Sequence, residues 1–132
     1  MPVGWNIRGV VITITIRANS DLRTALVQAM SSPEFPNMPA VLIDTRRATE
    51  NPTPDILRVR AGWIATVLSH RPGSRCAVLV GPRPHHYGLA RMLSVFLETE
   101  GVVAQVFTNI TEARTWLTPG DGRKARSAGG KE

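Results

Sequence analysis

The segment Ala40-Val41-Leu42-Ile43-Asp44 is a short apolar run that ends at a carboxylate. Such a run is typical of a β-strand that is buried on both faces of a parallel sheet. Cys76-Ala77-Val78-Leu79-Val80 repeats the pattern further along the chain. Because parallel neighbours need a crossover between them, usually a helix, this pair of runs predicts an α/β fold.

Helical patterns lie on either side of the first run. Before it, apolar residues repeat at every third or fourth position from Leu22 to Met30, after N-cap residues at Asn19-Ser20-Asp21. After it, Thr53-Pro54-Asp55 supplies an N-cap, a proline at the first helical position and an acid in the first turn. This second helix is predicted to run to about His70.

The alternation continues after the second run. A helix is predicted from His85 or His86 to Glu100, with Gly101 placed to end it. Val102 to Phe107 has the composition of a further strand, and Asn109 is expected to cap a last short helix. The order of elements is therefore strand, helix, strand, helix, as in a parallel sheet with right-handed crossovers.

The ends of the chain differ from each other. Val10 to Ile16 is a β-branched, alternating strand, and Val3 to Ile7 is predicted to pair with it through a turn at Arg8-Gly9. Residues 119–132 are rich in Gly, Ser, Ala and charge, which predicts a disordered tail. We therefore predict one α/β domain over residues 1–118, with a mostly parallel sheet of four to five strands and about four helices.

Composition narrows the class of protein. The chain has 132 residues, of which 42% are hydrophobic, enough for one core and too many for a fully disordered chain. Its single cysteine excludes a disulfide scaffold, and no stretch reaches the roughly 18 apolar residues that a membrane helix needs, so a cytoplasmic location is expected. Sixteen basic and ten acidic residues give a net charge of +6, which raises the expectation of an anionic partner.

Three segments carry a resemblance to a known family. They are Val41-Leu42-Ile43-Asp44-Thr45-Arg46, the more specific Tyr87-Gly88-Leu89-Ala90-Arg91-Met92, and the segment from Val106 to Leu117. With the spacing between them, these segments resemble the STAS-like bacterial proteins of the SpoIIAA-like superfamily over about residues 9–117. The resemblance implies a superhelix of β-α units, a fold shared with anti-sigma-factor antagonists and CRAL-TRIO lipid-binding domains.

The resemblance also bears on one modification site. In the antagonists, a partner kinase phosphorylates a serine at the start of the helix that follows the central strand. Thr53 stands at roughly that place here, but the Asp-Ser-Ser-Gly type of signature is absent. Thr53 is therefore a candidate phosphorylation site, and the alternative is an ordinary N-cap threonine.

A candidate ligand site lies at the carboxyl ends of the predicted parallel strands, where open α/β sheets usually bind ligands. Residues suited to an anion gather there: Arg46, Arg47, Arg83, His85, His86, Tyr87 and Arg91. The alternative is a set of solvated arginines around loops, with Asp44 as a hydrogen-bond acceptor that organises its loop. Arg91 is also predicted as an ion-pair partner of Asp44.

Other chemistry finds little support in the sequence. No spacing of Cys or His matches a metal site, no nucleotide-binding glycine loop occurs, and no cofactor is expected. Cys76 lies in an apolar strand, where a buried and inert thiol is the ordinary outcome. Nucleic-acid binding is not expected, because the larger aromatic residues fall at predicted core positions: Trp63, Phe96, Phe107 and Trp116.

Three functions remain open. The first is a non-catalytic STAS-like binding or regulatory module that acts through a protein partner or a homodimer. The second is a binder of an anionic lipid or phosphorylated small ligand at the arginine-rich edge. The third is an enzyme with an unrecognised site around Asp44, His85, His86 and Tyr87.

Overall fold

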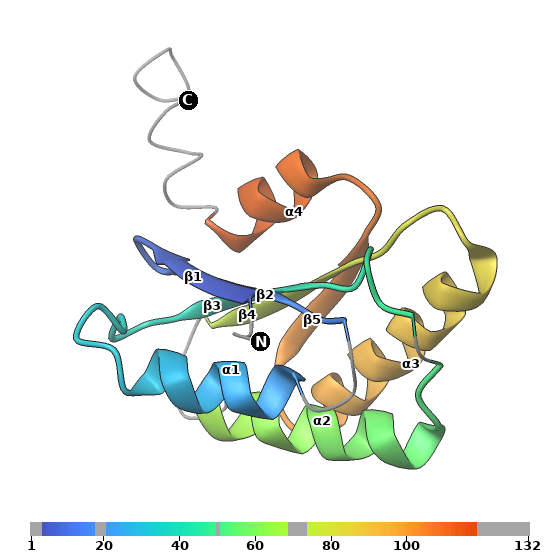
Figure 1. The fold of residues 1–132 in the computed structure, drawn as a ribbon, viewed down its shortest axis with the longest axis horizontal. Coiled ribbons are helices and arrows are strands. Elements are labelled where there is room, and N and C mark those ends of the chain that lie inside the picture. The colour runs from blue at the N-terminus through green and yellow to red at the C-terminus, as the bar shows by residue number, and fades with distance from the viewer. Residues whose placement is uncertain (1–3, 18–20, 50, 69–73, 119–132) are drawn as a thin grey trace.

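Five strands form one sheet in the order in which they occur in the sequence (Figure 1). In this computed structural model, residues 4–17, 21–49, 51–68 and 74–118 are described. The strands are β1 (Gly4–Arg8), β2 (Val11–Thr15), β3 (Ala40–Asp44), β4 (Arg75–Leu79) and β5 (Val103–Phe107). The helices in the described part of the chain are α1 (Asp21–Met30), α2 (Pro54–Leu68), α3 (Pro84–Thr99) and α4 (Ile110–Leu117).

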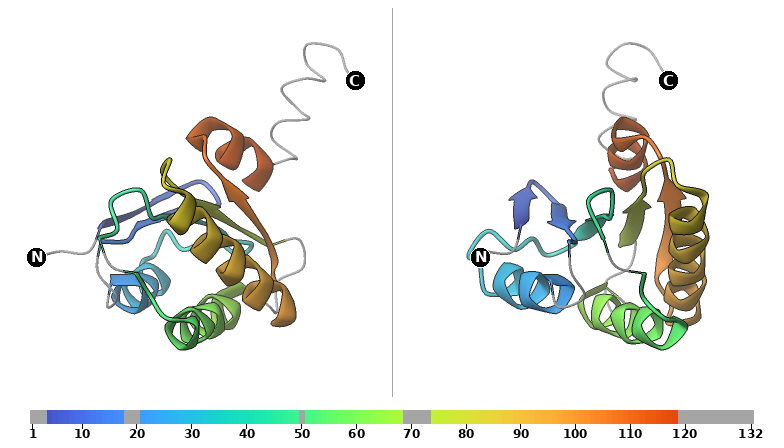
Figure 2. Two further views of the ribbon diagram at one scale, coloured as in Figure 1. Left: turned by 90° about the vertical axis from the view of Figure 1, so that its right-hand side faces the viewer. Right: turned by 45° about the vertical axis from the view of Figure 1, so that its right-hand side comes forward.

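The sheet is parallel except at one edge. β1 pairs antiparallel with β2, and the pairs β2–β3, β3–β4 and β4–β5 are parallel. From β2 to β5, each new strand is added at the same edge of the sheet. Because the crossovers between parallel strands are all right-handed, the helices that connect these strands lie on the same face. Accordingly α1, α2 and α3 cover one face and α4 covers part of the other (Figure 2). The predicted α/β class, with its mostly parallel sheet and four helices, is confirmed.

Two apolar cores lie on the two faces of the sheet. The larger one joins the inward side chains of the strands, among them Ile14, Ile43 and Val78, to α1, α2 and α3. The smaller one joins Leu42 and Leu79 to α4 and to Phe107. β3 and most of β4 are thus buried on both faces, as the two apolar runs predict.

The predicted aromatic core positions are only partly buried. Phe107 is buried, whereas Trp63, Phe96 and Trp116 are half-buried and pack against the cores from their margins. The Phe96 ring lies beneath the guanidinium of Arg58, 4.5 Å from the ring centroid. Such placement at the rim explains why helical periodicity alone overstated the burial of these side chains.

Two predicted glycine turns are confirmed. Gly9 has a φ of 58° in the tight turn between Arg8 and Val11, which are register partners in the β1–β2 hairpin. Gly101 has a φ of 88° after α3, where the Val102 amide donates to the Leu97 carbonyl at 2.9 Å and the Gly101 amide to the Glu98 carbonyl at 3.0 Å. This pair of bonds is a Schellman motif, which ends the helix.

Element ends differ slightly from the sequence prediction. α3 begins at Pro84, one residue before the predicted start, because the fixed φ of proline suits the first helical turn. α4 begins after Asn109, whose Oδ1 accepts a hydrogen bond from the Glu112 amide at 3.0 Å, as predicted. The predicted N-cap residues Asn19 and Ser20, the helix end at His70 and the tail 119–132 lie outside the described residues.

Candidate functional site

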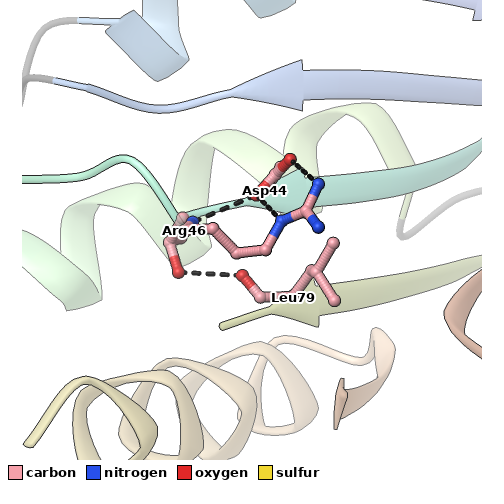
Figure 3. A network of polar contacts seen from close by, with 4 residues as sticks. Asp44, Arg46 and Leu79 are labelled. Carbon is pink, nitrogen blue, oxygen red and sulfur yellow. Dashed lines mark hydrogen bonds and ion pairs between the residues drawn. The ribbon is translucent and has the colours of Figure 1, made fainter. Parts of the chain in front are cut away.

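The end of β3 is built around the carboxylate of Asp44 (Figure 3). Its Oδ1 accepts hydrogen bonds from the Arg46 backbone amide and from Nε of Arg46, both at 3.0 Å. Its Oδ2 accepts a third bond from Nη2 of Arg46 at 2.9 Å, which is also an ion pair. The Asp-Thr-Arg step therefore closes a turn in which the side chain of Asp44 replaces a backbone acceptor.

Thr45 ties this turn to the next strand. Its backbone amide and its Oγ1 both donate to the Leu79 carbonyl, each at 2.9 Å. The loop after β3 is thus held to the end of β4 by two hydrogen bonds, in addition to the three between Arg46 and Asp44. These bonds define the path of the backbone at this part of the carboxyl edge.

The electrostatics of Asp44 follow from the same contacts. Burial raises the pKa of the Asp44 carboxyl, but hydrogen bonds from Arg46 and the charges of Arg46 and Arg47 outweigh it, so the pKa lies below its ordinary value. The Asp44 side chain accordingly holds the pKa of Arg46 above its usual range. Asp44 is a charged structural acceptor, and Arg91 is not its partner: that prediction is wrong, because Arg46 takes the carboxylate.

The pleat of the sheet divides the carboxyl edge into two sides. Asp44 shares a face with its register neighbours Thr15 and Leu79, which is the face that α4 covers. Thr45 follows on the other face, with Ile16 and Val78. The Asp44–Arg46 pair and the residues near α2 and α3 therefore lie on opposite sides of the sheet.

A pocket opens on the α2–α3 side. Its empty space is about 480 Å³, including the part that is open to solvent. The apolar lining comes from the ends of β2 and β4, the loop after β3, and α2 and α3: Ile16, Ala48, Pro52, Leu57, Val78, Leu89, Ala90 and Leu93. Four further lining residues carry polar groups: Arg17, Thr45, Arg60 and His86.

Arg60 is the unusual member of this lining. Only 6% of the residue is exposed, although long charged side chains are rarely buried. It lies on the buried face of α2, one turn from Leu57 and beside Ala61 and Ile64. Burial of a bare charge is costly, and Arg60 accordingly has an interaction partner within the chain.

Sequence reasoning missed Arg60 and Arg17 as site residues. A signal for Arg60 exists, because it occupies a position that the period of the apolar residues in α2 assigns to the core. Arg17 lies two residues after the end of β2 and is exposed. A basic residue is common at such a surface position, so the sequence gives no signal for it. Its part in the pocket depends on the approach of α2 and α3, which the sequence does not display.

Only one of the seven predicted anion-site residues lines this pocket. His86 is half-buried in it. Arg46 is engaged by Asp44 on the other side of the sheet, and the rest are exposed outside the lining: Arg47, Arg83, His85, Tyr87 and Arg91. Tyr87 follows His86 on α3 and is turned about 100° around the helix axis from it, so it does not wall the pocket.

The other predicted chemistry-bearing residues have local roles. Oγ1 of exposed Thr53 accepts a hydrogen bond from the Ile56 amide at 3.2 Å, which is an N-cap of α2. Cys76 is fully buried, and burial raises the pKa of its thiol to about 12. Within the described residues, no three His, Cys, Asp or Glu side chains lie close enough to share a metal ion.

Comparisons with protein families, with curated proteins and with solved structures find no match to this chain. Among the described helices, none has the length and apolar character required to cross a bilayer.

Proposed function

We propose that this protein is a binding module for a small organic anion, which it takes up in the pocket between α2 and α3. The observation that carries the proposal is the burial of Arg60 in a lining that is otherwise mostly apolar. A lining that combines guanidinium-bearing and apolar side chains is suited to a ligand that carries a negative charge at one end and hydrocarbon at the other. This is the anion-binding function that the sequence suggested, but the proposed site is now the pocket between α2 and α3, which contains His86 and none of the other predicted residues.

The polar residues of the lining match such a charge. Arg17 and Arg60 carry guanidinium groups, which pair with carboxylate or phosphate through two parallel hydrogen bonds. Thr45 and His86 add further polar groups to the lining. These four residues come from four separate segments of the chain, and the fold brings them together in one pocket.

The size of the pocket limits the apolar part. Its space of about 480 Å³ includes the part that is open to solvent, so the enclosed part is much smaller. A single short hydrocarbon chain along Leu57, Leu89 and Leu93 fits this space better than a two-chain lipid. We therefore favour a short-chain carboxylate over the anionic lipid or phosphorylated ligand that the sequence left open.

The place of the pocket supports the same function. Ligands in open α/β sheets bind outside the carboxyl ends of the strands. Ile16 and Arg17 follow β2, and Thr45 follows β3, so the pocket lies at that edge. The Thr45 bonds to Leu79 keep the edge rigid, which reduces the entropic cost of binding.

The test begins with native and denaturing mass spectrometry of the purified protein, which identifies any ligand by the mass lost on denaturation. Calorimetric titration then uses butyrate, hexanoate and octanoate, with the alcohols of equal length as neutral controls. We expect a carboxylate to bind and its alcohol to bind at least tenfold more weakly, because the charged hydrogen bonds to arginine are lost.

Matched variants localise the binding. Arg60→Met removes the charge and leaves an unbranched apolar side chain in its place. Leu89→Trp fills the pocket and leaves every charge in place. Both should weaken hexanoate binding roughly tenfold or more. Arg91→Gln removes the same charge from an exposed site on α3 outside the lining and should have no effect. Equal binding of acids and alcohols, or unchanged binding in both pocket variants, would contradict the proposal.

The protein-contact role predicted from the sequence has weaker support. The part of the second sheet face beyond α4 carries mostly polar side chains, namely Asn6, Arg8, Thr13 and Thr15. Stable dimers bury a more apolar surface. Regulation through a partner, and phosphorylation of Thr53, stay predictions of the family resemblance.

A further inference from the structure

A second hollow lies on the opposite face of the sheet, between the C-terminal end of α4 and the β1–β2 hairpin. Arg8, Val11 and Thr13 line it from the hairpin, and Arg114 and Thr118 line it from the end of α4. Its empty space is about 390 Å³, including the part open to solvent. It is separate from the proposed organic-anion pocket, and none of its residues lines both.

The fold fixes the position of each lining residue. Arg8 and Val11 are register partners beside the hairpin turn, and Thr13 is two residues along the same face of β2. Arg114 and Thr118 are four residues apart, so they lie on one side of the helix end. Residues from opposite ends of the described chain therefore meet across a single hollow.

The charge of this hollow is positive. Arg8 and Arg114 each contribute a guanidinium, both residues are exposed, and no acidic side chain is among the described residues that line the hollow. Thr13 and Thr118 add hydroxyl groups, and the Thr118 hydroxyl already donates to the Arg114 carbonyl at 2.9 Å. Two arginines that line one space are suited to an oxyanion with several acceptor oxygens.

The helix end would by itself disfavour an anion, since the last carbonyls carry partial negative charge. Here those carbonyls have donors. Nη1 of Arg75 donates to the Trp116 carbonyl at 2.9 Å, and its guanidinium lies 4.9 Å from the centroid of the Trp116 ring. The Thr118 amide bonds the Arg114 and Thr115 carbonyls. Arg75 thereby adds a third positive charge near this end of α4.

We propose that this hollow binds a phosphate group, held between the guanidiniums of Arg8 and Arg114. A phosphate monoester carries close to two negative charges at neutral pH, which matches two guanidiniums better than a carboxylate does. The group belongs either to a phosphorylated small molecule or to the headgroup of a phospholipid. The inference does not depend on the organic-anion function, because it concerns the other face of the sheet.

The experiment is a nuclear magnetic resonance titration of the ¹⁵N-labelled full chain with inorganic phosphate at constant ionic strength. We expect saturable shifts at Arg8, Thr13, Arg114 and Thr118, and much smaller shifts with acetate. The double variant Arg8→Gln/Arg114→Gln should bind phosphate at least roughly a hundredfold more weakly, about tenfold for each charged contact. A spectrum that stays dispersed shows that this variant remains folded.

Two control variants decide where the phosphate binds. Arg23→Gln/Arg91→Gln makes the same charge change at exposed sites on α1 and α3 and should leave the affinity unchanged. Arg123→Gln/Lys124→Gln/Arg126→Gln removes basic residues that follow α4 in the sequence and should leave the shifts in the hollow in place. Shifts that survive the Arg8/Arg114 change, that vanish with the tail change, or that acetate reproduces would overturn the proposal.

A vesicle arm identifies the source of the phosphate. The full chain is sedimented with phosphatidylcholine vesicles that contain phosphatidic acid. Cosedimentation that is lost in the Arg8→Gln/Arg114→Gln variant assigns the hollow to a lipid headgroup. Phosphate shifts without cosedimentation assign it to a soluble phosphate ester. Cosedimentation that the double variant retains in full, without phosphate shifts in the parent chain, would contradict the site.

Discussion

Asp44 and Arg46 form a closed unit at the carboxyl end of β3, because one carboxylate accepts three hydrogen bonds from a residue two positions away. Two come from the guanidinium and one from the backbone amide, all at 2.9–3.0 Å. The side chain of Asp44 is 11% exposed and that of Arg46 is 44% exposed. The carboxylate is therefore largely buried, whereas solvent reaches the guanidinium and screens its charge. Its role is to shape the edge of the sheet, and that role makes direct predictions.

Arg46→Gln should lower the free energy of unfolding by about 1–2 kcal/mol at neutral pH. The variant leaves the Asp44 carboxylate largely buried with fewer donors, but solvent reaches Arg46 and limits the loss. Chemical denaturation measures the change. Arg47→Gln, one residue on and exposed, is the control and should stay within about 0.5 kcal/mol of the parent. Equal losses in both variants would show that the pair does not stabilise the turn.

The same pair predicts an acid sensitivity. The pKa of folded Asp44 lies below its ordinary value of 3.8, so the unfolded chain takes up the proton first and protonation favours unfolding. The Asp44 contribution is therefore complete above about pH 5 and is lost as the pH falls through the folded pKa. Denaturation curves of the parent and of Asp44→Asn should converge towards low pH. A constant difference between them over this range would contradict the prediction.

The sequence predicts the fold well because strand and helix patterns here are local. The apolar runs that become β3 and β4, the turn at Gly9 and the stop at Gly101 each depend on a few adjacent residues. The ligand edge is less predictable, because the pleat sends Asp44 and Thr45 to opposite faces of the sheet. The positions of residues near the strand ends do not by themselves show on which face of the sheet each side chain lies.

Arg60 and Arg114 illustrate the rest of the difficulty. Arg60 interrupts an apolar helix face, which is a visible signal, but its place in a pocket depends on packing between α2 and α3. Arg114 and Arg8 line the same hollow only because α4 follows the last strand back over the sheet, towards the hairpin at the other end of the described chain. Contacts between segments this distant in sequence need the folded topology.

Cys76 should not react with thiol reagents while the protein is folded. The residue is fully buried, and burial raises the pKa of its thiol to about 12, so little thiolate exists and none is accessible. Labelling with a disulfide reagent should proceed at the rate of global unfolding and should accelerate with denaturant. Rapid labelling in native buffer would show that β4 opens locally at Cys76.

Two adjacent residues on α3 should differ in their importance for stability. Leu97 is fully buried, and Leu97→Ala should cost about 3–4 kcal/mol through lost burial and a cavity. Phe96 is half-buried beneath Arg58, so Phe96→Ala should cost about 2 kcal/mol, less than for a fully buried phenylalanine. Denaturation of both variants tests the ranking, and a larger loss for Phe96→Ala would place its ring deeper in the core than the structure does.

Gly101 and Gly88 should respond in opposite directions to the same substitution. Gly101 has a φ of 88° in the Schellman motif, and no atom lies within 4 Å of an added Cβ, so Gly101→Ala should cost about 1 kcal/mol through backbone strain alone. Gly88 is exposed inside α3 and also has open space, so Gly88→Ala should stabilise by up to about 1 kcal/mol through helix propensity. Thermal and chemical unfolding measure both. Loss of stability in both variants would mean that packing, and not backbone conformation, decides these positions.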